Sequence, residues 1–360
     1  MSGELFESFQ LSDLTLANRM VMAPLTRNRA DEENKVTPMM VKYYQQRSSA
    51  GLIITESAPI SQEGIGYPST PGIYSQDQVS AWNQLTDTVH AEGGHIFIQL
   101  QYCGRVSHPS LLPNNVAPVA PSAIKPEGHA VTYTGYQDFV MPRELKIDEI
   151  VEIVAQFKLA AKMAKNAGFD GIEVHGANGY IIDQFLRDGS NKREDHYGGN
   201  IDNRMRFLNE VLDAVCEIWP VHRVGVRLSP ENSFNSMSDS DPQEHFEYVV
   251  SQLNHRDLAY IHVLEGDMMS KSRIVDYSAL RDKYSGTYMA NNGYNLQRAS
   301  GAINNKNVDL VAFGTPFLAN PDLVYRYQKN LPLNDADPST FYGGDEIGYT
   351  DYPFFRCVTS

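Results

Sequence analysis

Short apolar segments alternate with longer amphipathic segments along most of the chain. The short segments end in polar or glycine residues, and the apolar positions of the longer ones recur at helical spacing. This alternation predicts strands followed by helices around a parallel sheet. The predicted strands are Met20–Pro24, Gly51–Thr55, Ile96–Leu100, Gly171–His175, Arg223–Leu228, Tyr260–Val263, Thr287–Ala290 and Leu310–Phe313.

Helical periodicity fills most of the intervals between these strands. The predicted helices are Gln76–Glu92, Ile147–Ala167, Asp202–Ile218, Pro242–Asn254, Asn295–Asn305 and Pro316–Gln328. Eight strands that alternate with helices predict an α/β fold of the (β/α)8 or TIM-barrel type, which needs roughly 250 residues. The remaining residues must form insertions and termini. The segment Tyr102–Lys146 is rich in Pro, Ser and Asn, so it predicts loop insertions after the third strand.

The length of 360 residues also allows two or three domains of about 150 residues each. However, the sequence contains no fixed-period repeat, low-complexity tract or long linker that would divide it. A doubly wound sheet is the main alternative, but the first strand is not followed by the GxGxxG motif that such a sheet uses to bind phosphate. We therefore expect residues 1–360 to form a single barrel domain.

Composition narrows the class of protein. Apolar residues make up 42% of the chain, and Lys plus Arg number 30 against 44 for Asp plus Glu, which gives a net charge of −14. This charge argues against nucleic acid or an anionic membrane as a partner. The cysteines Cys103, Cys216 and Cys357 form no CxxC pair, which argues against a disulfide framework or a cysteine-ligated metal. With no signal peptide and no membrane-length apolar run, a cytoplasmic protein is expected.

Polar residues at the carboxyl ends of barrel strands form the active sites of TIM barrels. The polar residues at these ends are Thr26, Arg27, Glu56, Gln99, Gln101, His175, Asn178, Tyr180, Arg227, Asn291, Asn292 and Thr315. They include no carboxylate pair of the kind that glycoside hydrolysis requires, and His175 has no second metal ligand at suitable spacing. The chain also lacks a GxSxG motif. We therefore expect no metal site.

Neutral or cationic hydrogen-bond donors dominate this set. Such donors suit an electron-rich planar cofactor, or a carbonyl that gains negative charge during a reaction. Arg227 would be costly inside a strand unless an anionic or electron-rich group met it. The glycine-containing turns after the seventh and eighth strands, at Gly293 and Gly314, occupy the usual phosphate-binding location of a barrel. Together these features predict a phosphorylated cofactor.

Four segments, in this order, resemble the old yellow enzymes, a family of FMN-dependent ene-reductases built on a TIM barrel. The segments are Ala23–Arg27 (APLTR), His175–Tyr180 (HGANGY), the stretch from Ser190–Arg193 (SNKR) through Tyr197–Gly199 (YGG) to Asn203–Arg204 (NR), and Tyr349–Pro353 (YTDYP). The resemblance spans nearly the whole chain. Thr26 stands where one branch of the family has cysteine, so the chain is similar to the Thr-type branch.

The resemblance implies a role for each site residue. His175 and Asn178 would donate to the carbonyl or nitro oxygen of an enone, nitro or quinone-like substrate, and Tyr180 would supply the proton to the α-carbon. NADPH or NADH would reduce the flavin. The FMN site would consist of Ala23, Pro24, Thr26, Ala58, Gln99, Arg227, Asn292, Gly293, Gly314 and Thr315. The substrate pocket would add Tyr67, Gln101 and Tyr349.

Three positions depart from the family pattern. Thr315 stands where an arginine usually clamps the flavin phosphate, Asn292 where glycine is common, and Gln101 where the Thr-type branch often has tryptophan. Loss of the arginine removes a contact of about 1.5–3 kcal/mol. A barrel that binds flavin or phenolic ligands with weak redox turnover is therefore an alternative, and a metal-dependent hydrolase that uses His175 is a weaker one. Either a monomer or a homodimer is expected.

Overall fold

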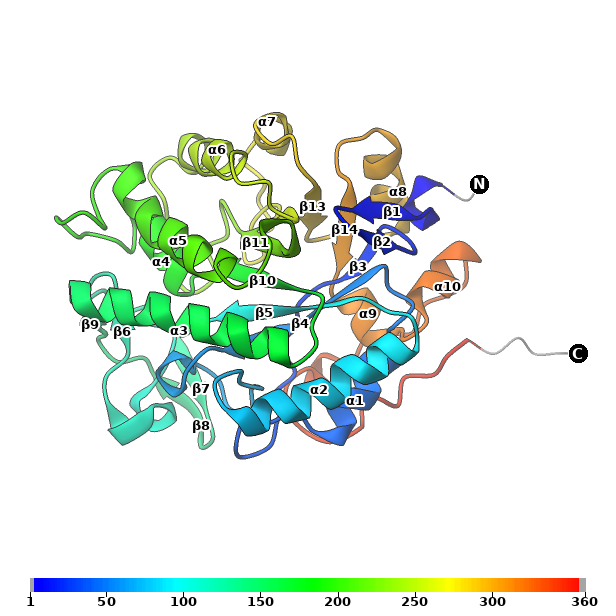
Figure 1. Cartoon of the computed structure of the whole chain (residues 1–360), viewed down its shortest axis with the longest axis horizontal. Coiled ribbons are helices and arrows are strands. Elements are labelled where there is room, and N and C mark those ends of the chain that lie inside the picture. Colours follow the sequence, from blue (N-terminus) through cyan, green and yellow to red (C-terminus); the bar gives the residue numbers. More distant parts are fainter. Residues whose placement is uncertain (1–2, 356–360) are drawn as a thin grey trace, which may run out of the picture.

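A closed barrel of eight parallel strands forms the centre of the computed structural model, which describes residues 3–355 (Figure 1). Its strands are β3 (Met20–Met22), β4 (Leu52–Pro59), β5 (Ile96–Gln101), β10 (Gly171–Gly176), β11 (Val224–Leu228), β12 (Tyr260–Leu264), β13 (Tyr288–Asn291) and β14 (Leu310–Phe313). Each pairs in parallel with the next, and β14 pairs with β3 to close the barrel. All eight predicted strands are present, and the predicted TIM barrel is confirmed. Cys357 lies outside the described residues.

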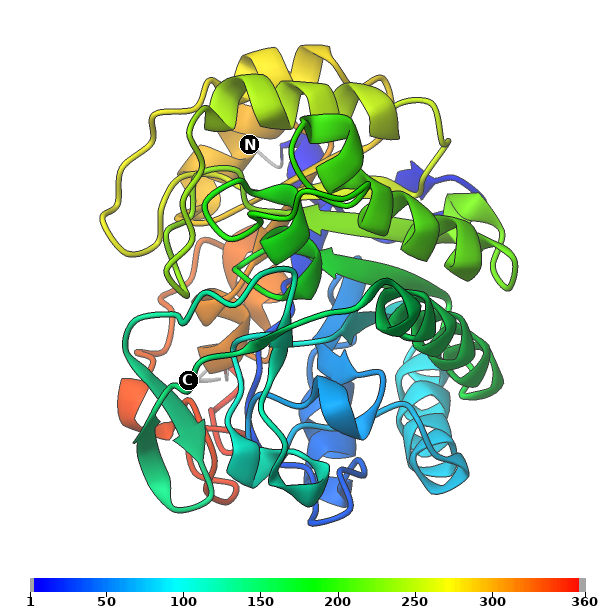
Figure 2. The same cartoon turned by 90° about the vertical axis from the view of Figure 1, so that its left-hand side faces the viewer.

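Helices surround the strands and bury their apolar faces against them (Figures 1 and 2). They are α1 (Pro38–Gln45), α2 (Gln76–Ala91), α3 (Ile147–Asn166), α4 (Ile181–Leu186), α5 (Ile201–Cys216), α6 (Pro242–Leu253), α7 (Tyr277–Asp282), α8 (Leu296–Asn304), α9 (Thr315–Ala319) and α10 (Leu323–Gln328). Side-chain caps set several starts: Ser75 begins α2 with a capping box, and Asn200 begins α5. The sequence pattern did not predict α1, α4 or α7, which are too short for a clear period.

The predicted helix Pro316–Gln328 is wrong, because the structure has two helices there. α9 ends at Ala319 and α10 begins at Leu323. Asn320 between them adopts an extended conformation, with φ −129° and ψ 93°. The following residue is Pro321, and a proline ring disfavours the helical conformation of the residue before it.

The first two barrel strands also differ from the prediction. β3 stops at Met22, whereas β4 continues through Pro59, and all eight of its residues are buried. The pairing of β4 with β5 shifts register between Ile54 and Ser57. This irregularity keeps the chain within the sheet while changing which side chains face the interior.

A small hairpin closes the amino-terminal end of the barrel. Strands β1 (Phe9–Leu11) and β2 (Leu14–Leu16) pair antiparallel. Their leucines pack with apolar residues from the first positions of several barrel strands, among them Leu52 and Leu310. The carboxyl end of the strands is therefore the end that can receive a ligand.

The insertion after β5 covers one side of that carboxyl end. It contains the paired strands β6 (Val119–Ala120) and β9 (Arg143–Glu144) and the hairpin of β7 (His129–Thr132) and β8 (Gly135–Asp138), which projects from the barrel in Figure 2. The predicted insertion after the third barrel strand is confirmed. None of the helices within residues 3–355 is long and apolar enough to cross a membrane.

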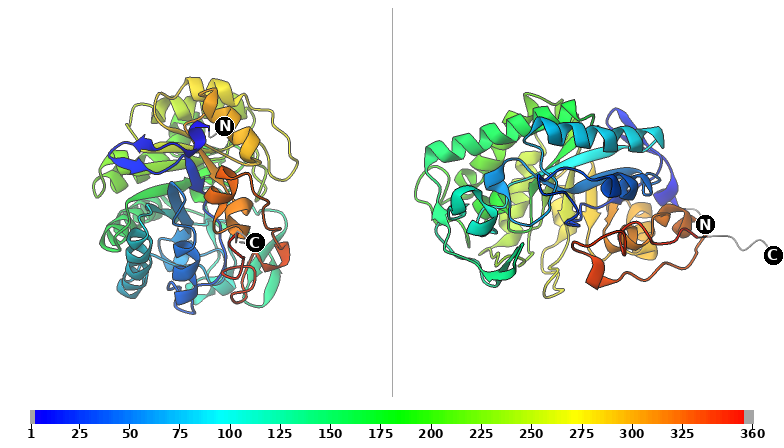
Figure 3. Two further views of the ribbon diagram at one scale, coloured as in Figure 1. Left: turned by 90° about the vertical axis from the view of Figure 1, so that its right-hand side faces the viewer. Right: turned by 90° about the horizontal axis from the view of Figure 1, so that it is seen from below.

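The carboxyl-terminal segment runs back over the outside of the barrel (Figure 3). Gln46 directly follows α1, and its Nε2 donates to the Thr350 carbonyl. Arg326 of α10 donates from Nη2 to the Pro353 carbonyl. These contacts tie the end of the described chain to two helices of the outer layer.

Candidate active site

Polar side chains from four neighbouring strands meet in the barrel interior. In the strand register, Glu173 of β10 lies opposite Gln99 of β5, and His175 lies opposite Arg227 of β11. Arg227 in turn lies opposite His262 of β12. All five side chains are buried. Because neighbouring strands point paired residues to the same side, the closure of the barrel brings these groups together.

His175 is held in one tautomer by its own loop. Its Nδ1 accepts a hydrogen bond from the Ala177 backbone N–H at 3.3 Å, which assigns the ring proton to Nε2. Burial, together with the nearby charge of Arg227 and the His262 ring, lowers the pKa of His175 well below its usual value. At neutral pH the ring is therefore uncharged, and Nε2–H is available as a donor.

Asn178 has an orientation that three neighbours determine. Its backbone N–H donates to Ser229 Oγ at 2.8 Å, and Asn235 Nδ2 donates to its carbonyl at 2.8 Å. Its side-chain Oδ1 accepts from Asn232 Nδ2 at 3.0 Å, which leaves the Asn178 amide donor free. The residue has a φ of +58°, a left-handed conformation that asparagine tolerates better than most residues.

Tyr180 and Tyr67 form a hydroxyl pair with 3.0 Å between their oxygen atoms. The Tyr180 ring also meets the His175 ring edge to face, with 4.9 Å between centroids. Burial, followed by the proximity of Tyr67 and Cys103, raises the pKa of Tyr180 well above its usual value. Tyr180 is therefore protonated at neutral pH and can give up a proton.

A groove of about 780 Å³ lies beside this pair and reaches the residues of β7. Tyr67 lines the groove, and Tyr180 belongs to the same apolar cluster as Val106, Ala130 and Phe139 of its lining. The apolar lining of the groove includes Tyr67, Val106, Phe139 and Met237. Gln101 is buried next to Tyr180. Its side-chain amide donates to Cys103 Sγ at 3.1 Å, and hydrogen bonding from Gln101 also reaches Tyr180. The structure thus brings Tyr67 and Gln101, two of the three predicted substrate residues, next to Tyr180.

Tyr349, which the resemblance also placed in the substrate pocket, is not among the residues that line this groove. Its side chain is fully buried, and its ring stacks on Tyr43 of α1 with 4.1 Å between centroids. The guanidinium groups of Arg27 and Arg29 lie 4.9 and 4.3 Å from the ring centre. Cation–π contacts and stacking hold Tyr349 inside this cluster, because the carboxyl-terminal segment packs down onto α1.

The residues predicted to bind the flavin ring provide the donors that such a ring needs. Arg227 Nη2 donates to Asn291 Oδ1 at 3.1 Å, whereas its Nε is buried and has no partner. Thr26 Oγ1 lies 3.5 Å from Ser57 Oγ, and Ala58 is fully buried beside it. A buried N–H without an acceptor is costly, so an electron-rich group that meets Arg227 Nε would relieve that cost. The residues present therefore fit FMN.

Ala23 and Pro24 follow β3 and are also buried. The Ala23 N–H donates to the Phe313 carbonyl at 3.1 Å, which extends the β3–β14 contact beyond the strand. These two residues connect the end of β3 with the Thr26 side of the site.

Two turns form the predicted phosphate end. After β13, Asn292 and Gly293 have φ of +83° and +69°, and Asn292 Nδ2 donates to the Glu265 carbonyl at 2.9 Å. The left-handed conformation explains why glycine suits position 292. After β14, Gly314 precedes α9, and Thr315 is exposed at its first position with no side-chain cap.

Sequence reasoning missed a cation at this end of the site. Arg298 Nη1 donates to the carbonyls of Asn292 and Gly293 at 3.0 and 3.2 Å, and Nη2 reaches Glu265. Arg298 lies in α8 rather than at the end of a strand, so the sequence gave no indication that it belongs to the site. Sequence reasoning also missed Asn232, which orients Asn178, and His262, which contacts Glu173. A polar residue within a buried strand was the available signal for His262.

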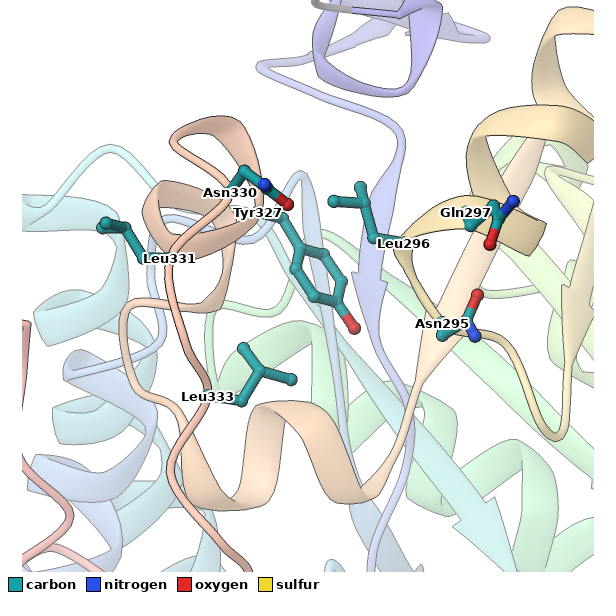
Figure 4. A pocket seen from close by; sticks show the side chains of 7 residues that line it. All are labelled: Asn295, Leu296, Gln297, Tyr327, Asn330, Leu331 and Leu333. Atoms are coloured by element: carbon teal, nitrogen blue, oxygen red, sulfur yellow. The ribbon is translucent and has the colours of Figure 1, made fainter.

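A further pocket of about 440 Å³ lies outside the barrel, between the start of α8 and the end of α10 (Figure 4). Its lining consists of Asn295, Leu296, Gln297, Tyr327, Asn330, Leu331 and Leu333. It contains none of the predicted site residues, so the groove that Tyr67 lines is the better candidate for substrate.

Comparisons with known proteins identify the family of this chain. The family model for NADH:flavin oxidoreductases and NADH oxidases matches residues 4–334. A probable flavin mononucleotide-dependent alkene reductase of Leishmania infantum is 46% identical over 344 residues, which cover 94% of each chain.

Two solved structures resemble the whole fold. Morphinone reductase in complex with tetrahydroNAD has a TM-score of 0.94 and 42% identity, and the match covers 99% of each chain. The old yellow enzyme homologue from Zymomonas mobilis has a TM-score of 0.95 and 39% identity, over 98% of this chain and 100% of that one. The chain therefore belongs to the NADH:flavin oxidoreductase/NADH oxidase family, the family of the old yellow enzymes, and it is an FMN-dependent oxidoreductase.

Proposed function

We propose that this protein uses NADPH or NADH to reduce the carbon–carbon double bond of α,β-unsaturated carbonyl or nitro compounds. The observation that carries the proposal is a set of three neutral donors at and just after the end of one strand, β10: His175 Nε2–H, the Asn178 amide and the Tyr180 hydroxyl. Tyr180 contacts the His175 ring and the hydroxyl of Tyr67, and Tyr67 lines the groove. Bound FMN would supply the redox chemistry by passing a hydride from the nicotinamide to the β-carbon of the substrate.

His175 and Asn178 would bind the activating oxygen of the substrate. Negative charge builds on this oxygen as the β-carbon is reduced, and preoriented donors in a dry site stabilise such charge strongly. The Ala177 N–H fixes the donor atom of His175, and Asn232 fixes that of Asn178. Neither side chain needs to reorganise when charge develops, which favours the reaction.

Tyr180 would deliver the proton to the α-carbon as a general acid. Its raised pKa keeps the proton in place until the substrate carbon becomes basic. The Tyr67 hydroxyl, 3.0 Å away, can donate to the Tyr180 oxygen after the proton has left. The groove beyond them has a largely apolar lining, which suits the hydrocarbon part of such a substrate.

FMN would lie against Pro24, Thr26, Ala58, Gln99 and Arg227, with its phosphate at the two turns. The family membership and the similarity to an alkene reductase support this placement. The unpartnered Nε of Arg227 supports it independently, because a buried donor without an acceptor marks a position where a ligand atom is expected.

An anaerobic spectral titration tests both half-reactions in one cuvette. FMN-reconstituted protein should lose its flavin absorbance when NADPH is added and recover it when 2-cyclohexenone follows. Failure to bind FMN would contradict the proposal. Bleaching without recovery would point to a different acceptor, and bound flavin that NADPH does not reduce would favour a binding protein.

A further inference from the structure

Glu173 and His262 form a buried pair next to the proposed flavin contacts. Glu173 Oε2 and His262 Nδ1 are 2.8 Å apart, and both side chains are fully buried. Gln99 Nε2 donates to the other carboxylate oxygen of Glu173 at 2.7 Å. Each carboxylate oxygen thus has a partner, and Gln99, a proposed flavin contact, is held by Glu173.

The charge of each group in this buried layer follows from the direction of its pKa shift. Burial alone would raise the pKa of Glu173, but His262, Arg227 and Gln99 outweigh burial and hold that pKa below its usual value. Burial lowers the pKa of His262, so its ring is neutral and donates from Nδ1. The layer therefore contains two charged groups, the Glu173 carboxylate and the Arg227 guanidinium, which keeps its charge in proteins.

The strand register explains why these two charges act on each other. Glu173 lies opposite Gly225 of β11, and Arg227 is two residues further along, on the same side of that strand. Arg227 donates to Asn291 rather than to a carboxylate, so its charge is balanced through space and remains available to a ligand. Charges act strongly on each other in such a buried layer.

We propose that Glu173 and His262 are positioning residues that set the reduction potential of the bound flavin, an inference that rests on the proposed function. Glu173 offsets part of the positive charge that Arg227 presents to the ring. His262 holds the carboxylate in place, and the Glu173 contact turns Gln99 so that its amide oxygen stays free. Two-electron reduction of FMN with uptake of one proton leaves the ring with a negative charge, so the net charge of this layer biases the equilibrium.

The test is an anaerobic equilibrium titration of FMN-loaded protein against a redox dye of known potential. Glu173→Gln keeps the shape of the side chain and removes its charge, so the Arg227 charge is no longer offset. We expect the reduced flavin to be favoured at least tenfold more than in the wild type, an upward shift of about 30 mV for a two-electron couple.

Two variants serve as controls. His262→Gln removes the imidazole partner but keeps the Glu173 charge, so its potential should shift less than that of Glu173→Gln. Glu210→Gln removes a half-buried carboxylate on the outer helix α5 that accepts from the Tyr197 hydroxyl at 2.8 Å. It should leave the potential unchanged, because it lies outside the barrel.

The outcomes separate this inference from the function on which it rests. If the wild type does not bind FMN, the proposed function fails and this inference with it. If Glu173→Gln binds FMN with an unchanged or lowered potential, only this inference is overturned, and a lower melting temperature alone would then indicate a purely structural role.

A second measurement covers the case in which Glu173→Gln does not fold. In wild-type protein labelled with carboxyl-13C glutamate, reduction of FMN should shift the infrared band of one carboxylate. The same band should be present in labelled Glu210→Gln protein, and it should lie at a different frequency in labelled His262→Gln protein. The absence of such a band would overturn the inference.

Discussion

Two donors of the site are oriented by a neighbour that hydrogen-bonds to their other polar atom. The Ala177 N–H donates to His175 Nδ1, and Asn232 Nδ2 donates to Asn178 Oδ1. Tyr180 differs, because its neighbour Tyr67 is a hydroxyl that can either donate or accept. This difference suits the roles proposed for them, in which His175 and Asn178 bind an oxygen atom and Tyr180 releases a proton.

The Tyr180→Phe variant separates proton transfer from the other steps. We expect reduction of the bound flavin by NADPH to stay within about threefold of the wild type, because that half-reaction needs no proton from residue 180. Reoxidation by 2-cyclohexenone should slow by at least about 100-fold, the usual contribution of a general acid. Stopped-flow absorbance of the flavin measures both half-reactions separately.

Tyr67→Phe is the matched control, because it also removes one hydroxyl from the pair but leaves Tyr180 in place. It should slow reoxidation far less than Tyr180→Phe. An equal loss in both half-reactions of the Tyr180 variant would count against its role as the proton donor.

At the scale of elements, the start of α9 and the turn after β13 form the proposed phosphate site, and they provide few positive charges. α9 offers the free N–H groups of a helix start, and Thr315 adds a hydroxyl there but no cation. Arg298 lies at the neighbouring turn, but its donors are shared among two carbonyls and Glu265. Backbone N–H groups therefore carry most of the proposed phosphate contact.

The Thr315→Arg variant should bind FMN more tightly. A charge-assisted contact contributes about 1.5–3 kcal/mol, so the FMN Kd should fall roughly 10- to 100-fold. Fluorescence quenching of FMN during reconstitution measures this Kd, and the gain should shrink at high salt because ions screen exposed charges.

Thr315→Gln is the control for length without charge. Its Kd should stay within about threefold of the wild type. If glutamine tightened binding as much as arginine, the missing cation would not be the cause of the difference, and an unchanged Kd in Thr315→Arg would place the phosphate elsewhere.

At the scale of the whole molecule, a fully buried carboxyl in β4 links stability to pH. Glu56 accepts from the Arg27 N–H at 3.2 Å and from the Tyr44 hydroxyl at 3.4 Å. Burial raises the pKa of Glu56 to about 7, although the Arg27 hydrogen bond works in the opposite direction. The folded protein therefore keeps a proton that the unfolded chain releases near pH 4.5.

This difference makes the contribution of Glu56 to stability largest in acid. It is fully present below the unfolded pKa and is lost as pH rises toward 7, at about 1.4 kcal/mol per pH unit. Between pH 5.5 and 8, the free energy of unfolding of the wild type should fall by about 2 kcal/mol relative to Glu56→Gln, whose side chain stays neutral. Urea unfolding of both proteins at the two pH values measures the difference.

Other groups also titrate in this range, but they are common to both proteins and cancel in the comparison. Parallel stability curves for the wild type and Glu56→Gln would show that Glu56 does not hold its proton in the folded state.

Much of the fold could be predicted because its signals are local. Apolar runs and helical periods repeat within short windows, and they located all eight barrel strands and the insertion after β5. The same windows failed where one residue overrides a period, as Pro321 does between α9 and α10. The register shift in β4 has no local signal, because it depends on the pairing with β5.

The sequence by itself determined the barrel, the family and the residue types at the strand ends, because period, turn chemistry and motifs are properties of neighbouring residues. Only the tertiary structure decided how those residues work together. Asn178 is oriented by a residue 54 positions away, and Glu173 is paired with one 89 positions away. Such contacts form only when the barrel closes. In the same way, the packing of the carboxyl-terminal segment onto α1 buries Tyr349 between Tyr43 and two arginines, a contact that no local pattern indicates.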